Sequence, residues 1–357
     1  MKIFTIGPVQ MDKSILKANN KGIKYFRNED FSQKMLKIEQ KILQILNAPK
    51  DFKSVILTSS GTGGMDAVIS NMPENKKVLI INGGTFGQRF VDMCKFYNIS
   101  YDELIVEYNQ DLTDEMLEPF KKNEYFALLC NICETSNGKL YDQNVLNNFC
   151  EKQECYLIID AISSMFADEY DLSKFNADVT IFSSHKGLAL APGICVCIFS
   201  GRYINNVIDK VDSKSYYFNL KEHLKNMERG QTPFTPGLAE IEQLYVRLNK
   251  ITSYKEEVNK ANANAKYFRE QIKLLGFDFP QFKLSNCITP MICPNEDADE
   301  ILKFLKKKNV YVNPCGGNNF KKILRISHVG NLNIKDFKRL IKLLRRYINE
   351  SNFNGCR

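Results

Sequence analysis

The sequence lacks tryptophan, and it has no apolar stretch of the roughly 18 residues that a membrane-spanning helix needs. It also lacks internal repeats and low-complexity linkers. Its first residues do not contain the long apolar core of a signal peptide. These absences argue against membrane-spanning and repeat proteins. We therefore expect a globular, cytoplasmic protein with no membrane partner.

Charge and cysteine content exclude further classes. The net charge of +8 is modest for 357 residues, and we interpret the lysine-rich stretches 303–308 and 335–346 as solvated helix faces. No RNA- or DNA-binding module is present, so no nucleic-acid partner is expected. The eleven cysteines are scattered, and the pair Cys130-x-x-Cys133 has no second pair to complete a zinc site. We expect buried thiols in a reducing compartment and no bound metal.

Short apolar runs alternate with helical patterns along the first two thirds of the chain. The runs are 78–82, 100–107, 127–130, 156–160, 179–182 and 194–199. This alternation is typical of an α/β fold, with a mostly parallel sheet and helices on both of its faces. Cys195 and Cys197 alternate with apolar residues, so both should face the same side of the sheet.

The pattern changes near residue 238, where a helical pattern begins and continues to about 275. Beyond it, strands are predicted over 285–293, 310–312 and 323–327, and helices over 297–307 and 334–347. The length of 357 residues is sufficient for two domains and a substantial core. We therefore expect a smaller C-terminal domain.

Lys186 is the most informative residue. It follows the run 179–182, lies in the motif Ser-Ser-His-Lys-Gly at 183–187, and precedes the apolar stretch 188–199. A lysine held in such surroundings loses its proton more readily, because desolvation disfavours the ammonium. A neutral amine is what Schiff-base chemistry requires. A lone lysine at a strand end is more often a solvated charge, so its neighbours decide the interpretation.

Two motifs precede Lys186 in the sequence. The run 156–160 ends in Asp160, and ligands collect at the carboxyl ends of buried parallel strands. An acid there suits the pyridine nitrogen of pyridoxal phosphate, although an acid is equally suited to capping the next turn. The segment 54–68 runs from a strand through Ser-Gly-Thr-Gly-Gly at 60–64 into a helix, and a helix start of this kind binds anions.

The glycine-rich turn does not match the common nucleotide motifs. The dinucleotide fingerprint needs Gly or Ala where Asp66 stands, and the Gly-Lys-Ser/Thr of the mononucleotide P-loop is absent. A glycine-rich turn followed in order by Asp160 and Lys186 instead indicates a pyridoxal phosphate site.

These motifs resemble those of class V aminotransferases in the pyridoxal-phosphate fold-type I superfamily. The most similar branch holds the alanine–glyoxylate, serine–pyruvate and 2-aminoethylphosphonate–pyruvate transaminases. The resemblance extends from Ile-Gly-Pro-Val at 6–9 to the C-terminal helix. It implies a large domain over 15–250 with a mostly parallel, seven-stranded sheet flanked by helices. It also implies a smaller α+β domain over 251–357, to which residues 1–14 pack.

The resemblance also implies an activity. The enzyme would move an amino group from a small amino acid or aminophosphonate to a 2-oxo acid by ping-pong chemistry, with pyridoxal 5′-phosphate as its cofactor. It would be a homodimer whose active sites are shared across the interface. Lys186 would form the Schiff base with the cofactor and shuttle the proton, and Asp160 would pair with the pyridine nitrogen.

Other matching residues receive roles in the same way. The remaining implied contacts are Thr62, Gly63, Gly64 and His185 to the phosphate, Phe86 stacked on the pyridine ring, Thr135 near the phenolic oxygen, Thr235 to the partner's phosphate, and Arg325 to the substrate carboxylate. A planar guanidinium suits that last task. His185 stands where relatives have Gln or Asn, and Asn137 replaces a hydroxyl residue.

Two alternatives stay open. A cysteine desulfurase or related lyase uses the same fold, and Cys315 is the nearest candidate nucleophile. Those enzymes stack a histidine on the ring, whereas this chain has Phe86. The other alternative is a non-catalytic relative with a binding or regulatory role. The joint presence of Lys186, Asp160 and Arg325 argues against it.

Overall fold

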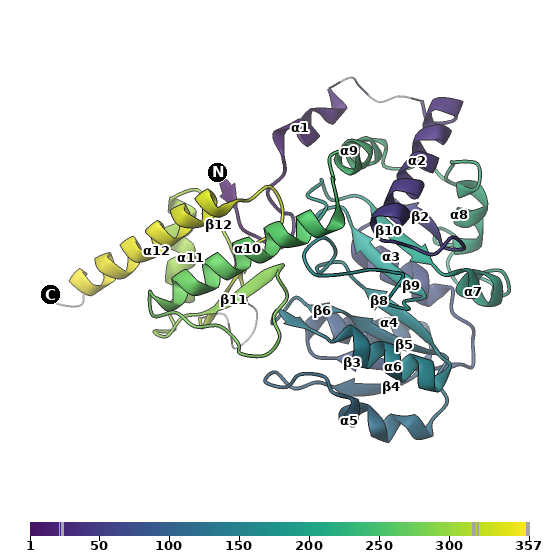
Figure 1. Ribbon diagram of the computed structural model, residues 1–357, viewed down its shortest axis with the longest axis horizontal. Helices are drawn as coiled ribbons and strands as arrows, with labels where there is room; N and C mark the ends of the chain where they lie inside the picture. Colours follow the sequence, from purple (N-terminus) through teal and green to yellow (C-terminus); the bar gives the residue numbers. More distant parts are fainter. Residues whose placement is uncertain (21, 23–24, 316–318, 320, 355–357) are drawn as a thin grey trace.

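The computed structural model describes the chain except for residues 21, 23–24, 316–318, 320 and 355–357. The last three residues of the predicted small domain therefore lie outside the described residues. Figure 1 shows two parts: a larger one built on a twisted sheet, and a smaller one, formed mainly by the C-terminal third of the chain, that carries α10, α11 and α12.

The larger part contains a seven-stranded sheet. In spatial order its strands are β2 (Lys53–Leu57), β10 (Cys195–Phe199), β9 (Val179–Ser183), β8 (Tyr156–Asp160), β5 (Ala127–Asn131), β3 (Lys77–Asn82) and β4 (Ser100–Ile105). Neighbouring strands are parallel except at β10, which is antiparallel to both β2 and β9. The predicted α/β fold with a mostly parallel, seven-stranded sheet is confirmed.

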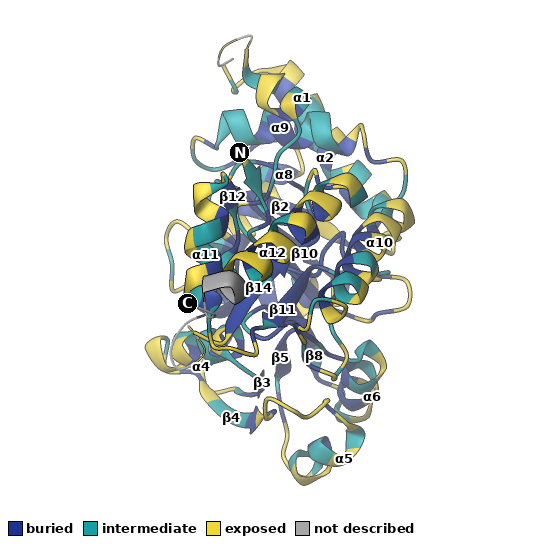
Figure 2. Cartoon of the chain, turned by 90° about the vertical axis from the view of Figure 1, so that its left-hand side faces the viewer, coloured by how far each residue is buried: buried dark blue, intermediate teal, exposed yellow. Residues whose placement is uncertain are grey.

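Helices cover both faces of this sheet, because its strands are buried on both sides. Alternate side chains of β2 show the division, since Ile56 packs in one apolar cluster while Val55 and Leu57 pack in the other. The first cluster is closed by α2 (Glu29–Ile45), α6 (Gln143–Gln153) and α9 (Leu238–Leu248), and the second by α3 (Gly61–Ser70), α4 (Thr85–Phe96), α7 (Gly201–Tyr203) and α8 (Leu220–Met227). Figure 2 shows the resulting buried centre in dark blue.

The smaller part has its own sheet and core. Its elements are α10 (Tyr254–Lys273), β11 (Ile288–Ile292), α11 (Ala298–Lys307), β12 (Val310–Tyr311), β13 (Asn313–Pro314), β14 (Ile323–Ser327) and α12 (Ile334–Asn354). β11, β14 and β13 form an antiparallel sheet in that order, and the N-terminal strand β1 (Lys2–Ile3) runs parallel to β12. A separate apolar cluster and the β1–β12 pairing support the proposed division into 15–250 and 251–357 with 1–14.

Short elements complete the chain. They are α1 (Lys13–Leu16), η1 (Lys17–Asn19), α5 (Asp114–Leu117), η2 (Glu118–Lys122), β6 (Cys133–Glu134), β7 (Lys139–Leu140) and η3 (Ile204–Ile208). β6 and β7 form an antiparallel pair that projects beyond β5 towards the smaller part.

Several predicted boundaries differ from the structure. The strand predicted over 285–293 begins only at Ile288, because residues 283–285 form hydrogen bonds with the β7 region instead. The helical pattern over 238–275 is two helices, and Ser253 caps the second by accepting a hydrogen bond from the Glu256 N–H. The strand predicted over 100–107 ends at Ile105, and the last helix continues to Asn354.

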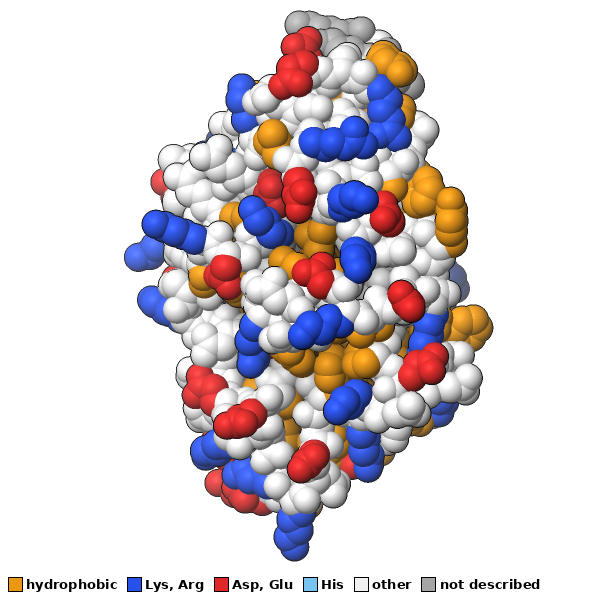
Figure 3. All heavy atoms as spheres, turned by 90° about the vertical axis from the view of Figure 1, so that its right-hand side faces the viewer, with side chains coloured by type: hydrophobic (Ala, Val, Ile, Leu, Met, Phe, Trp, Pro, Cys, Tyr) orange, Lys and Arg blue, Asp and Glu red, His pale blue; other side chains and the backbone are white. Residues whose placement is uncertain are grey.

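The surface carries charges of both signs. On the face seen in Figure 3, Lys and Arg side chains alternate with Asp and Glu rather than forming a field of one sign. Among the described residues, no helix is both long and apolar enough to cross a bilayer.

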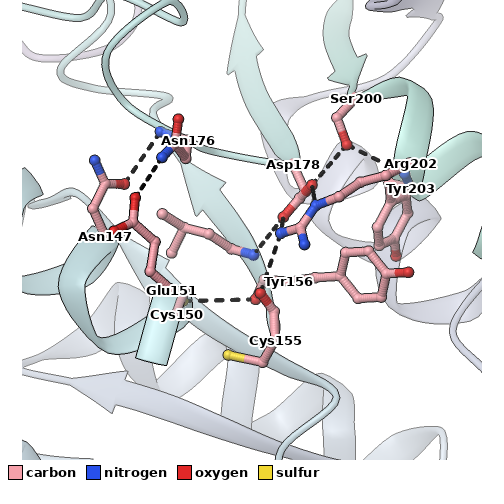
Figure 4. Close-up of polar contacts among 11 residues, drawn as sticks. Asn147, Cys150, Glu151, Cys155, Tyr156, Asn176, Asp178, Ser200, Arg202 and Tyr203 are labelled. Carbon is pink, nitrogen blue, oxygen red and sulfur yellow. Dashed lines mark hydrogen bonds and ion pairs between the residues drawn. The ribbon is translucent and has the colours of Figure 1, made fainter. Parts of the chain in front are cut away.

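A buried acid closes the amino-terminal end of the central strands. Asp178, only 2% exposed, accepts hydrogen bonds from the Leu157 N–H at 3.0 Å and the Ser200 hydroxyl at 2.7 Å. The Arg202 guanidinium donates to both carboxylate oxygens, at 2.6 and 2.5 Å, and lies 4.9 Å from the Tyr156 ring centroid. Figure 4 shows these groups converging between β8 and β9.

Replacing Arg202 with Met should lower the free energy of unfolding by about 1–3 kcal/mol, because Asp178 would keep its buried charge without its strongest donor. Urea unfolding of the two proteins measures the difference. Arg346→Met is the matched control, since Arg346 pairs with Glu350 on an exposed helix face and should change stability by less than about 0.5 kcal/mol. Equal effects of both substitutions would contradict the assigned role of Asp178.

Candidate active site

The predicted site residues converge where the parallel strands end. β8 ends at Asp160, and β9 ends just before His185 and Lys186. The first turns of α3 and α4 follow β2 and β3 at the same edge of the sheet. Arg325 enters this region from β14 of the smaller part. The site therefore lies between the two parts, at the place where ligands collect in open α/β sheets.

Lys186 is enclosed at this edge. It is 8% exposed, and burial lowers the pKa of its amine, while the nearby Cys287 and Asp160 act in the opposite direction. Within the described part of the chain, no hydrogen-bond partner holds its Nζ. The N-terminal segment covers it so closely that a Cβ on Gly7 would lie 3.1 Å from Nζ. The sequence motif did not reveal this role of Gly7.

Asp160 is a buried carboxylate with one satisfied oxygen. Its Oδ1 accepts a hydrogen bond from the Ile162 N–H at 2.8 Å, and no described residue donates to the other oxygen. Burial raises the pKa of Asp160 to about 6, against the opposing charges of Lys186 and Arg89. Such an acid, with one oxygen available, is suited to a protonated ring nitrogen.

The start of α3 supplies an anion site. The first amides of a helix, here those of Gly61 and Thr62, have no intrahelical partner. The Ser60 side chain, which precedes the helix, does not cap them either. The amide of Gly63 already donates to the Ser60 carbonyl at 3.0 Å. The Thr62 hydroxyl accepts a hydrogen bond of 2.7 Å from Arg89 Nη1, a contact that the sequence did not predict.

The side of Gly64 on which a Cβ would lie faces the sheet. A Cβ on Gly64 would lie 2.3 Å from the Cys195 sulfur and 2.8 Å from Ile181 Cγ2, so the residue packs α3 against the sheet. Cys195 and Cys197 belong to the same apolar cluster, which confirms the prediction that both face one side. The glycine at this position thus has a packing reason of its own, beside its proposed phosphate contact.

His185 is half-buried beside Lys186. Burial, followed by the Lys186 charge, lowers its pKa to about 4, so the imidazole is neutral at physiological pH. Its Nδ1 is buried and has no partner among the described groups. A neutral ring of this kind offers one N–H donor to an anion.

Phe86 is oriented by a buried carboxylate that the sequence analysis did not assign. Glu134, fully buried, accepts hydrogen bonds from the amides of Phe86 and Gly87 at 3.1 and 3.0 Å. It also accepts from Asn131 Nδ2 and the Ser136 N–H, both at 3.0 Å. An acid at the start of α4 also interacts favourably with the helix dipole. In the sequence, Glu134 follows an apolar run and begins the Glu-Thr-Ser segment at 134–136, to which a resemblance was noted but no role for the acid was assigned.

Arg325 and Thr135 meet across the two parts. The Thr135 hydroxyl shares a hydrogen bond of 2.5 Å with Ser163, and its carbonyl accepts from Arg325 Nη1 at 3.2 Å. Arg325 Nη2 donates to the Pro314 carbonyl at 3.0 Å, and Nε is buried without a partner. No described acid forms an ion pair with Arg325. The Arg325 guanidinium is therefore held in one position, and its positive charge is available to an anionic ligand.

A cavity of about 600 Å³ opens beside Arg325. Its described lining includes Phe86, Tyr108, Asn137, Cys315 and Asn319. This lining is polar and aromatic but has no second cation among the described side chains. Thr235, by contrast, is exposed and forms none of these contacts.

Comparison with known proteins agrees with this geometry. The family model of class V aminotransferases matches residues 13–332. An uncharacterized aminotransferase of Helicobacter pylori is 27% identical over 345 residues, covering 92% of this chain and 89% of that protein. Alanine–glyoxylate aminotransferase 1 of Saccharomyces cerevisiae is 24% identical and covers 88% of each chain.

Solved structures show the same fold. The aspartate aminotransferase of subgroup IV from Thermus thermophilus superposes with a TM-score of 0.90 at 21% identity, covering 98% of this chain and 99% of that chain.

The chain belongs to the class V aminotransferases. It is a transaminase that depends on pyridoxal phosphate, and the available oxygen of Asp160, the unpaired Lys186 amine and the free amides of α3 fit that cofactor.

Replacing Asp160 with Asn should stabilise the cofactor-free protein at pH 8 by on the order of 2 kcal/mol. The folded pKa of about 6 lies above the unfolded value of about 3.9, so the Asp160 charge destabilises the fold as pH rises through this window. Urea unfolding at pH 4.5 and pH 8 measures the gain, which should be smaller at pH 4.5. Asp209→Asn, at an exposed position, should give no gain. A gain that does not change with pH would contradict the assignment.

Proposed function

We propose that this enzyme moves an amino group from a small amino acid or aminophosphonate to a 2-oxo acid by ping-pong chemistry. The observation that carries the proposal is the enclosed Lys186 amine, which has no hydrogen-bond partner among the described residues and lies between the charges of Asp160 and Arg325. The relatives that match the chain include transaminases for alanine and glyoxylate and for aminoethylphosphonate.

Pyridoxal phosphate supplies an aldehyde carbon that reacts with amines and a ring that takes up negative charge. Lys186 would hold the cofactor covalently until the substrate amine displaces it, and the freed Lys186 amine would then remove the substrate Cα proton and deliver it to the cofactor. The lowered pKa of Lys186, caused by burial, favours the neutral amine that both tasks require. Asp160 would keep the ring nitrogen protonated.

The other proposed contacts follow the same geometry. Thr62, Gly63, Gly64 and His185 would hold the phosphate, Phe86 would stack on the ring, and Thr135 would lie near the phenolic oxygen. Arg325 would bind the substrate carboxylate in the adjoining cavity, where its guanidinium has no acidic partner among the described groups. We also propose a homodimer in which the exposed Thr235 reaches the phosphate of the partner's site.

The cysteine desulfurase alternative depends on Cys315. This residue does line the cavity, but it is 8% exposed, and its sulfur contacts the Ser136 carbonyl at 3.8 Å. Burial raises the pKa of the Cys315 thiol, although the Arg325 charge opposes the shift. A nucleophilic cysteine needs the thiolate, so this setting favours the transaminase. The ten described cysteines are free thiols, which supports the proposal of a reducing, cytoplasmic environment.

Lys186→Ala should abolish turnover and remove the visible absorbance that covalent attachment of pyridoxal phosphate produces. Absorbance spectra of the purified variant, with and without added cofactor, test the attachment. Lys260→Ala is the control, because Lys260 is an exposed lysine outside the site whose pKa is also lowered by its surroundings. If Lys186→Ala retains both the absorbance and the turnover, with wild-type contamination excluded, the assignment of Lys186 fails.

Arg325→Ala should raise the KM for the amino donor by about tenfold to a hundredfold, because a charge-assisted hydrogen bond to a carboxylate contributes about 1.5–3 kcal/mol. The same substitution should leave the cofactor absorbance intact. Steady-state kinetics with alanine, serine and 2-aminoethylphosphonate measure the change. An unchanged KM for alanine and serine would exclude Arg325 as the carboxylate-binding group, whereas 2-aminoethylphosphonate, which has a phosphonate in place of a carboxylate, tests whether Arg325 binds that anion.

A further inference from the structure

Arg89 contacts two proposed cofactor ligands at once. It lies in the first turns of α4, and its Nη1 donates to the Thr62 hydroxyl of α3 at 2.7 Å. The carbon at the centre of its guanidinium lies 4.9 Å from the centroid of the Phe86 ring. Thr62 and Phe86 come from different strand–helix units, so Arg89 ties two sides of the site together.

The hydrogen bond from Arg89 determines which way the hydroxyl proton of Thr62 points. A threonine hydroxyl has one O–H donor and two acceptor lone pairs. Because Arg89 can only donate, Thr62 uses a lone pair for this contact and keeps its own O–H for another acceptor. That O–H belongs to the second residue of α3, beside the amides without an intrahelical partner. The arrangement prepares Thr62 as a donor to an anion.

The contact between Arg89 and Phe86 restricts the orientation of the Phe86 ring. Residues three apart on a helix share a face, so Arg89 lies over Phe86. A cation above one face of an aromatic ring is an attractive contact, and it restricts the ring to one orientation. Phe86 also lines the cavity beside Arg325, where a flat ligand can reach it.

The charge of Arg89 is not cancelled locally. Within the described part of the chain it forms no ion pair with a carboxylate. It nevertheless acts on Asp160, where it opposes the effect of burial. If Arg89 only joined α3 to α4, it would not have to contact Phe86 or lie near Asp160. Both contacts therefore point to a role in the site.

We propose that Arg89 is a positioning residue of the cofactor site: it turns the Thr62 hydroxyl towards the cofactor phosphate and holds Phe86 flat for stacking. This inference rests on the proposed cofactor contacts. Arg89 itself need not touch the cofactor, since it acts through these two side chains.

The test is the equilibrium affinity of the cofactor-free enzyme for pyridoxal phosphate. Arg89→Met and Thr62→Val should each weaken that affinity about tenfold or more. The double variant should lose less affinity than the sum of the two single losses, because both substitutions act in part through the Thr62 hydroxyl. A pH titration of the visible absorbance should also shift in Arg89→Met, through the loss of a cation near Asp160.

Arg202→Met provides the matched control, because Arg202 also lies 4.9 Å from an aromatic ring and binds a side-chain oxygen, but at the far end of the sheet. It should lower the melting temperature without changing cofactor affinity. Three results would overturn the inference alone: wild-type affinity in Arg89→Met, additive losses in the double variant, or an equal loss in Arg202→Met. If the wild-type protein itself takes up no pyridoxal phosphate, the proposed function fails as well.

Discussion

The whole site depends on keeping the Lys186 amine out of water. An ammonium in solution would not attack a carbonyl, and desolvation is the means by which this fold favours the neutral form. The enclosure uses both parts of the chain, since Gly7 covers the amine from the N-terminal segment and Cys287 lies near it from the smaller part. The neighbouring groups must then tolerate burial too. This explains why Asp160 and Glu134 are also withdrawn from solvent.

These buried acids are satisfied in different ways, and the difference matches their tasks. Glu134 accepts several amide and side-chain hydrogen bonds, so its charge is committed to holding the start of α4. Asp160 has one occupied oxygen and one available oxygen, so part of its bonding capacity is left for a ligand. Structural acids in such a site are fully satisfied, whereas functional ones carry a cost in stability.

Sequence patterns predicted the sheet and its edge well, because βα alternation is a property of successive segments. Asp160 ends an apolar run, Lys186 follows one and Arg325 lies within one, and the three residues do meet at one place. The sequence could not reveal Arg89 or Gly7. Arg89 depends on the distance between α3 and α4, and Gly7 depends on the return of the N-terminal segment to the site. Contacts between elements distant along the chain leave no local pattern to read.

The N-terminal segment has a consequence for the order in which the molecule is completed during synthesis. β1 leaves the ribosome first, yet its partner β12 is made only after the whole larger part. Until β12 emerges, β1, which lies just before Gly7, has no partner strand. The sheet of the larger part is therefore synthesised before β1 can pair, and the full enclosure of Lys186 must await the synthesis of the smaller part.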